Sequence, residues 1–181
     1  SLGAFARRGA AMPTHLIPGA NRGIGLALTR TYRARGDAVI GVCRHASAEL
    51  EQSGARVEAG VDVTDGPALA GLAARLKGVH LDTLVLNAGI LGKEALQQFE
   101  VNALGPLRVA QALLAQLGQG SKIGIVTSRM GSVSDNGSGG YYGYRASKAA
   151  VNAIGKSLAL DLAPRGIAVF LLHPGYVATD M

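Results

Sequence analysis

The sequence is poor in the residues that build cross-linked or metal-bound proteins. Its 181 residues include one cysteine, Cys43, and no tryptophan, and aromatic residues make up only 4% of the chain. A single thiol excludes an internal disulfide framework, and no cysteine or histidine cluster has the spacing of a zinc site. We therefore expect no metal centre and a reducing, cytoplasmic location.

Long hydrophobic runs are also missing. No apolar stretch approaches the roughly 20 residues that cross a bilayer, and the first 15 residues lack the apolar segment of a secretory signal. We expect no membrane partner. Residues 1–11 are expected to be a flexible N-terminal extension, and Met12 would be a natural start for the folded domain.

Positive charge is in excess but is not concentrated. The formal net charge is +6, and the arginines between Arg22 and Arg56 fall singly. No lysine-rich run or series of interleaved aromatics forms the stacking platform of a nucleic-acid-binding protein. The charge therefore favours a solvated basic face or an anionic cofactor, and we expect no nucleic-acid partner.

The chain contains an alternation of short apolar runs and helix-like stretches. This order is typical of βαβ units and predicts a doubly wound parallel α/β sheet, a Rossmann fold, in one domain over residues 12–181. Six strands are expected, at residues 15–17, 38–42, 56–61, 81–86, 122–127 and 167–172. Helices are expected at 24–35, after a cap at Thr64 or Asp65, at about 95–117 and at 142–162. The wholly apolar sixth run is typical of a strand buried on both faces.

A glycine-rich turn, GANRGIG at residues 19–25, lies between the first expected strand and the first expected helix. Glycines here would let the backbone approach a pyrophosphate at the positive end of the helix. A plain tight turn is the alternative, and the position in the first βα unit favours the phosphate site.

Tyr144 and Lys148 are four residues apart, so both lie on one face of a helix. A phenol is a poor acid at neutral pH, but a neighbouring ammonium would lower its pKa toward the working range. Ser128 ends the fifth strand, where its hydroxyl could hold a substrate oxygen beside Tyr144. A solvated helix face and an ordinary turn serine are the alternatives, and Ser132 is a second candidate for the hydroxyl.

The residues after the second strand bear on the choice of cofactor. A carboxylate at this point would favour NAD, whereas the chain has Cys43 and Arg44 and no acid until Glu49. Arg22 and Arg44 together could hold a phosphate through charge-assisted hydrogen bonds. We therefore predict NADP(H) in preference to NAD(H), with ordinary surface arginines as the alternative.

These motifs occur in an order that resembles the short-chain dehydrogenase/reductase family, over residues 12–181. The order begins with the glycine turn and continues through Asp62-Val63, Asn87-Ala88-Gly89, Asn102, Ser128, the segment YRASK at 144–148 and the segment HPG at 173–175. The sequence of these segments is similar to that of the branch of C-factor-like carbonyl reductases. Each motif alone is weak, and their common order is specific.

The resemblance implies an NADPH-dependent oxidoreductase that reduces a ketone or aldehyde to an alcohol, or catalyses the reverse reaction. Its implied catalytic residues are Asn102, Ser128, Tyr144 and Lys148, with Asn102 perturbing its helix and supporting a water chain to the lysine. A buried capping asparagine is the alternative for Asn102. The implied cofactor contacts are Gly19, Asn21, Arg22, Gly23, Ile24, Gly25, Arg44, Asp62, Val63, Asn87, Ala88, Gly89, Tyr144, Lys148, Pro174, Gly175, Val177 and Thr179. A small-molecule carbonyl substrate and a homodimer or homotetramer are the implied partners.

The chain departs from the family's pattern at several places. Pro18 stands where the family commonly has threonine, the interval from Asn87 to Asn102 is short, and the sequence ends at Met181, before the family's last strand and substrate lid. We expect the short interval to have lost a turn or more of helix between Leu91 and Phe99. These departures leave a second hypothesis open, a nucleotide-binding regulatory or signalling protein with little turnover.

Overall fold

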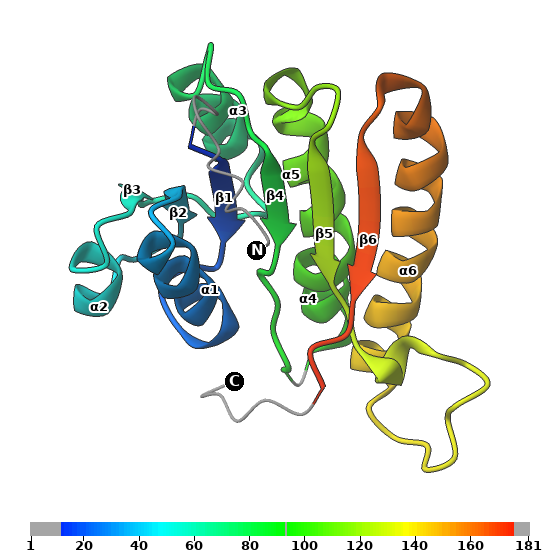
Figure 1. Ribbon diagram of the computed structural model, residues 1–181. Helices are drawn as coiled ribbons and strands as arrows, with labels where there is room; N and C mark the ends of the chain where they lie inside the picture. The colour runs from blue at the N-terminus through cyan, green and yellow to red at the C-terminus, as the bar shows by residue number, and fades with distance from the viewer. Residues whose placement is uncertain (1–11, 93, 176–181) are drawn as a thin grey trace, which may run out of the picture.

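The computed structural model describes residues 12–92 and 94–175. Its six strands are all parallel and form one sheet in the order β3-β2-β1-β4-β5-β6 (Figure 1). The strands are β1 (Thr14–Pro18), β2 (Ala38–Val42), β3 (Arg56–Glu58), β4 (Thr83–Leu86), β5 (Lys122–Val126) and β6 (Ala168–Leu172). The prediction of a doubly wound sheet in one domain is confirmed, and β2 has its predicted bounds.

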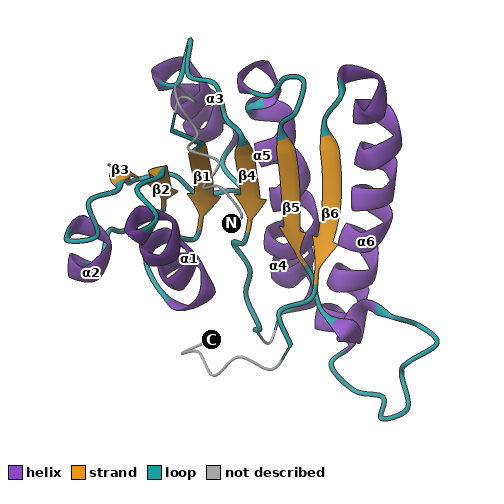
Figure 2. Ribbon diagram, in the orientation of Figure 1, coloured by secondary structure: helices purple, strands orange, loops and turns teal. Residues whose placement is uncertain are grey.

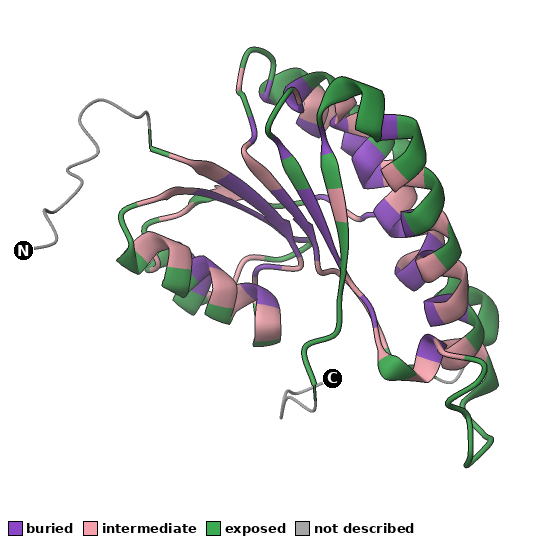
Figure 3. Cartoon of the chain, turned by 45° about the vertical axis from the view of Figure 1, so that its right-hand side comes forward, coloured by how far each residue is buried: buried purple, intermediate pink, exposed green. Residues whose placement is uncertain are grey.

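Helices cover both faces of this sheet (Figure 3). The α-helices of the described residues are α1 (Gly23–Ala34), α2 (Ala48–Glu51), α3 (Gly66–Arg75), α4 (Ala95–Phe99), α5 (Gly105–Ala112) and α6 (Tyr142–Leu162). One core cluster joins the sheet to α3, α5 and α6, and another joins it to α1 and α2. Leu16 of β1, Leu84 of β4 and Ile123 of β5 are fully buried. The two clusters show why the central strands are apolar without alternation.

The prediction of a single helix at about 95–117 is wrong. The chain forms α4, a π-helix (Glu100–Leu104), α5 and a 3₁₀ turn (Leu114–Gln116). Pro106 has no N–H for the carbonyl of Asn102, and its ring would clash with that carbonyl in a regular α-helix. The wider π turn accommodates this proline, and π turns are frequent at functional sites.

The expectation that the sixth strand is buried on both faces is also wrong. β6 is the last strand in the sheet order, and Phe170, Leu171 and Leu172 are each more than 40% exposed. Figure 3 shows this strand as largely exposed at the edge. β5 pairs with one edge of this strand and α6 packs against it, and the apolar side chains of its last three residues stay exposed.

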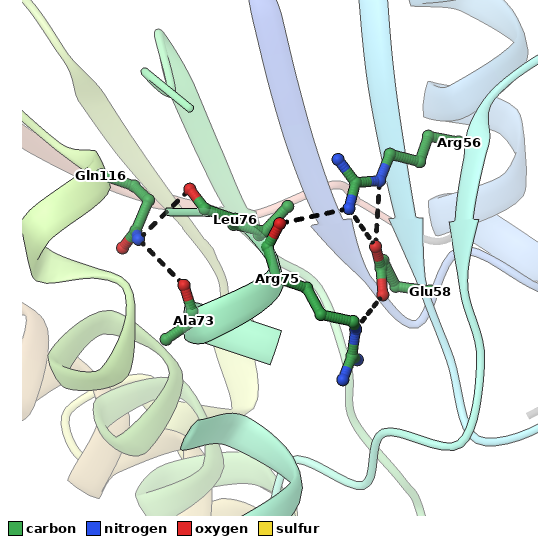
Figure 4. Close-up of polar contacts among 6 residues, drawn as sticks. All are labelled: Arg56, Glu58, Ala73, Arg75, Leu76 and Gln116. Atoms are coloured by element: carbon green, nitrogen blue, oxygen red, sulfur yellow. Dashed lines mark hydrogen bonds and ion pairs between the residues drawn. The ribbon is translucent and has the colours of Figure 1, made fainter. Parts of the chain in front are cut away.

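An ion-pair cluster fastens the opposite edge of the sheet to α3. The carboxylate of Glu58, at the end of β3, accepts hydrogen bonds from Arg56 at 2.6 Å and from Arg75 of α3 at 2.7 Å (Figure 4). Its side chain is only 9% exposed. Partial burial raises the pKa of Glu58, but the two guanidinium groups outweigh burial and lower the net pKa.

The last turn of α3 is held by Gln116, whose side-chain amide donates to the carbonyl of Ala73 at 3.3 Å (Figure 4).

In the described residues, no helix is both long enough and apolar enough to cross a membrane.

Candidate active site

A cleft of about 670 Å³ lies at the carboxyl ends of the central strands. The loops that follow β1, β2, β4 and β5 line it. The direction of winding reverses here, because β2 lies on one side of β1 and β4 lies on the other. Ligands of doubly wound sheets bind at such a reversal.

The loop after β1 needs its glycines for two different reasons. Gly19 and Gly23 have φ values of +76° and +53°, in the left-handed region that favours glycine. A Cβ at Gly25 would instead lie 2.6 Å from Nδ2 of Asn87 and would overlap the carbonyl oxygen of Gly19. The loop leads directly into α1, whose first N–H groups and dipole favour an anion. This cradle of bare backbone fits the pyrophosphate of a dinucleotide.

Pro18 removes a hydrogen-bond donor on the side of β1 where little is lost. Its carbonyl faces β4 and accepts from Nδ2 of Asn87 at 3.3 Å. The missing N–H would face the same way, beyond Leu16 and Leu84, the last residues that pair between β1 and β4. On the β2 side, the N–H of Gly19 donates to Val42 at 2.8 Å. The backbone of β1 therefore tolerates the proline.

The end of β2 presents an arginine to the cleft. Nη1 of Arg44 lies 3.8 Å from Oδ2 of Asp62, and the Arg44 side chain is 65% exposed. The other oxygen of Asp62 accepts from the backbone N–H and the hydroxyl of Thr64 at 2.8 and 2.7 Å. Partial burial raises the pKa of Asp62, but these hydrogen bonds and Arg44 outweigh it and lower the net pKa. Arg22 also lines the cleft.

The segment after β4 packs directly on the glycine loop. Nδ2 of Asn87 donates to the carbonyl of Gly19 at 3.2 Å, and a Cβ on Gly19 would lie 3.1 Å from Cα of Ala88. A Cβ on Gly89 would lie 3.8 Å from Nζ of Lys148. The segment therefore joins the phosphate end of the cleft to the end that carries Lys148.

Asn102 lies in the π-helix, 1% exposed, and its amide is fully engaged by protein groups. Its Oδ1 accepts from the N–H of Ile90 at 2.8 Å, and its Nδ2 donates to the carbonyl of Ile90 at 2.8 Å and to Oγ of Ser147 at 3.1 Å. Asn102 does not line the cleft. It supports the wall from behind by tying the loop after β4 to α6.

Ser128 lies where β5 ends, and it lines the cleft. Its Oγ accepts from the N–H of Met130 at 3.1 Å, which starts the 3₁₀ turn Arg129–Gly131. Ser128 also lies close enough to Tyr144 for its hydroxyl, as a hydrogen-bond donor, to lower the pKa of the phenol. Ser132 does not line the cleft and instead contacts Ser134. The geometry therefore favours Ser128 over Ser132 as the partner of the tyrosine.

Tyr144 and Lys148 come from the first two turns of α6 and lie side by side. Nζ of Lys148 is 5.7 Å from the centre of the Tyr144 ring and donates to the carbonyl of Val126 at 3.0 Å. Burial lowers the pKa of Lys148 to about 8. Burial also raises the pKa of Tyr144, and the hydrogen bond with Ser128 opposes this rise only in part. The expectation that Lys148 brings the phenol pKa down is therefore wrong for this structure, since burial has the larger effect.

The loop between β5 and α6 extends away from the sheet (Figure 2). Arg145, in the first turn of α6, ties its far end by donating to the carbonyl of Gly140 at 3.2 Å and to Oγ of Ser138 at 3.0 Å. At the near end Gly131 sits on α6, where a Cβ would lie 2.8 Å from the carbonyl oxygen of Lys148. The loop is thus fixed to α6 at both ends.

Comparison with known proteins agrees with this geometry. A family model described as short chain dehydrogenase matches residues 13–181. The chain belongs to the short-chain dehydrogenase family. It is accordingly an NAD(P)-dependent oxidoreductase by descent, and the expected fold and family are confirmed.

Two curated relatives of this short-chain dehydrogenase are similar in sequence. The 1-hydroxy-2-glutathionyl-2-methyl-3-butene dehydrogenase of Rhodococcus sp. (strain AD45) is 45% identical over 94% of this chain and 80% of its own length. The C-signal protein of Myxococcus xanthus is 46% identical over 56% of this chain and 68% of its own length. The predicted likeness to C-factor proteins is thus seen in the sequence comparison.

Solved structures give the same family. A short-chain dehydrogenase/reductase from Burkholderia multivorans with bound NADP has a TM-score of 0.88 and 33% identity, covering 94% of this chain and 82% of the other. A carbonyl reductase from Pseudomonas aeruginosa PAO1 in complex with NADP has a TM-score of 0.83 and 33% identity, covering 92% and 84%.

The fold of this short-chain dehydrogenase brings most of the predicted site residues to the cleft. Among the described ones, only Gly25 and Asn102 do not line it, and both lie directly behind its wall. Pro174 and Gly175 line it as expected, whereas Val177 and Thr179 lie outside the described residues. No group of three or more potential metal-binding side chains occurs in the part of the chain that the structure describes.

Several residues of the cleft were not predicted from the sequence. Ile90, Gln97 and Val101 line the cleft, and Val126 supplies the carbonyl that receives Lys148. Val126 ends β5, so its place at the carboxyl edge could have identified it. Gln97 had no such signal, because it lies within α4 and not at the end of a strand.

Proposed function

We propose that the protein is an NADPH-dependent carbonyl reductase that converts a ketone or aldehyde to an alcohol and can catalyse the reverse reaction. The observation that carries the proposal is the convergence of Ser128, Tyr144 and Lys148 at one end of a cleft whose other end is a glycine loop. The carbonyl reductase with NADP among the similar structures supports the same reaction class.

The side chains can be given separate roles. When bound, NADPH supplies the hydride that adds to the carbonyl carbon. Tyr144 donates its phenolic proton to the carbonyl oxygen and is later reprotonated from solvent, while Ser128 holds that oxygen by a hydrogen bond. Lys148 binds the ribose and its positive charge stabilises the phenolate that remains. The phenol is protonated at neutral pH, as a proton donor must be, although its raised pKa makes it a weaker acid.

Arg22 and Arg44 support NADP(H) in preference to NAD(H), because no carboxylate directly follows β2 to repel a 2′-phosphate. Replacing Arg44 with aspartate should raise the KM for NADPH at least tenfold and leave that for NADH similar or lower. An equal rise in the KM for both nucleotides would show that Arg44 does not bind the 2′-phosphate.

The test of activity is the oxidation of NADPH, followed by absorbance, against a panel of aldehydes and diketones. Tyr144→Phe should lower kcat by at least a hundredfold and leave NADPH binding intact in calorimetry. If the protein consumed no NADPH with any compound, and the variant matched it, the enzymatic proposal would be wrong.

The 45% identity to a dehydrogenase of a glutathionyl alcohol adds one compound class to this panel. Oxidation of glutathione-conjugated alcohols with NADP as acceptor tests the reverse reaction directly.

A second candidate is a nucleotide-binding signalling protein with little turnover, favoured by the 46% identity to C-signal over part of the chain. Tight NADPH binding in calorimetry without turnover would support it, and no binding at all would contradict both candidates. We further propose a homodimer or homotetramer, which light scattering after size-exclusion chromatography tests.

A further inference from the structure

Tyr144 is held from both sides along α6 by one neighbouring segment, α4 and the π-helix that follows it. The first contact is at Gly143, directly before the tyrosine. A Cβ on Gly143 would lie 2.7 Å from Cα and 2.8 Å from Cβ of Ala95, and 2.9 Å from Nε2 of Gln98. Since backbone atoms cannot move aside as a side chain can, only glycine allows α6 to start this close to α4 (Figure 1).

The second contact is at Ser147, three residues after the tyrosine and directly before Lys148. Ser147 is fully buried, and its hydroxyl donates to the carbonyl of Tyr144 at 2.8 Å. Its oxygen accepts from Nδ2 of Asn102 at 3.1 Å. Asn102 in turn binds both backbone groups of Ile90 in the cleft wall. A continuous hydrogen-bond chain therefore runs from the loop after β4 to the backbone of Tyr144.

We propose that Ser147 and Gly143 are positioning residues that fix the phenol of Tyr144 relative to Ser128 and Lys148. This inference rests on the proposed function for its kinetic consequence. Neither residue lines the cleft, so each acts through the tyrosine and not on substrate. A displacement of about 1 Å at a reacting group can lower a rate by roughly a hundredfold.

The chemistry predicts a direction for the change. The hydrogen bond from Ser128 is the interaction that opposes the rise in the pKa of Tyr144. If Ser147→Ala loosens this part of α6, the bond weakens and burial dominates, so the phenol pKa rises further. If Ser147 served folding stability alone, the molecules that fold would keep the phenol pKa, the kcat and the KM of the wild type.

The experiment uses the full chain and compares Ser147→Ala with Ser157→Ala, an exposed serine on the same helix. We expect Ser147→Ala to lower kcat at least tenfold, to change the Kd for NADPH less than threefold and to shift the pH profile of kcat upward. Ser157→Ala should change none of these. Gly143→Ala should lower kcat more than Ser147→Ala, against Gly66→Ala in α3, where a Cβ meets nothing within 4 Å.

A second measurement is independent of turnover. In protein labelled with ¹³C at the tyrosine Cζ, the Tyr144 resonance is assigned by Tyr144→Phe and titrated with base. Ser147→Ala should raise its pKa by about half a unit or more, and Ser157→Ala should not. An unchanged Tyr144 pKa in Ser147→Ala overturns the inference, even if the variant is less stable. If the wild type shows no turnover, the proposed function fails while this titration still decides the positioning role.

Discussion

Lys148 is a charged group that the fold buries at a cost to stability. Its residue is 6% exposed, and burial lowers its pKa from 10.5 to about 8. Replacing it with methionine, which has similar length and no charge, should abolish catalysis and make the folded protein more stable at pH 7.

The magnitude follows from the pKa shift. A fall from 10.5 to about 8 corresponds to roughly 3 kcal/mol of disfavoured charge in the folded state, since each pKa unit is worth about 1.4 kcal/mol. The hydrogen bond from Lys148 to the carbonyl of Val126 is lost in the variant, which costs about 1 kcal/mol. We expect Lys148→Met to raise the free energy of unfolding by about 2 kcal/mol at pH 7.

The pH dependence gives the sign of the effect independently. Below pH 8 the lysine is protonated in both the folded and the unfolded chain, so the full cost of burial is present. Between about pH 8 and 10.5 the folded chain loses this proton first, so the wild type gains stability as the pH rises. The advantage of Lys148→Met should therefore shrink across this window.

Urea denaturation followed by far-ultraviolet circular dichroism at pH 7 and pH 10 measures both effects, and the absence of tryptophan makes this signal preferable to fluorescence. Lys156→Met, an exposed lysine of the same helix, is the matched control and should change stability by less than about 0.5 kcal/mol. A loss of stability in Lys148→Met at pH 7, or a gain that is equal at both pH values, would refute the reasoning.

Other variants test separate parts of the structure. Glu58→Gln should lower the free energy of unfolding by about 1–3 kcal/mol at pH 7, and because the folded pKa of Glu58 is lowered, the wild-type advantage should be present at neutral pH and disappear as acid protonates it in denaturation curves. Gly25→Ala should abolish NADPH binding in calorimetry and destabilise the fold, since its Cβ meets the carbonyl of Gly19, whereas Gly66→Ala should do neither. Pro18→Thr should raise the melting temperature or the NADPH affinity, and no change in either would show that the position is tolerant.

The six strands, the doubly wound sheet and most of the cleft could be predicted because they depend on local pattern and chain order. The apolar run of β2 and the helical periodicity over α6 predicted the bounds of both elements correctly. Residues at the carboxyl ends of parallel strands must meet at one edge of the sheet. The break at Asn102 was implied by the family resemblance and not by the helical pattern, because it depends on Pro106 and on the hydrogen bonds between Asn102 and the backbone of Ile90. Neither could the exposure of β6, because an apolar pattern does not say which strand ends a sheet.

The pKa of Tyr144 shows a similar limit within the site. The spacing of Tyr144 and Lys148 correctly placed both on one helix face. It could not weigh the attraction of the lysine charge against the burial of the phenol, which depends on the depth of the cleft and on Ser128.

The two anchors of the loop between β5 and α6 have a consequence for how such a protein can diversify. Gly131 fixes the start of the loop on α6, and Arg145 fixes its end, so the residues between them can change in number without moving Ser128 or Tyr144. Loop length and catalytic geometry are therefore inherited independently. Insertions at positions 133–137 should leave the reaction centre unchanged, because neither Gly131 nor the partners of Arg145 would be altered.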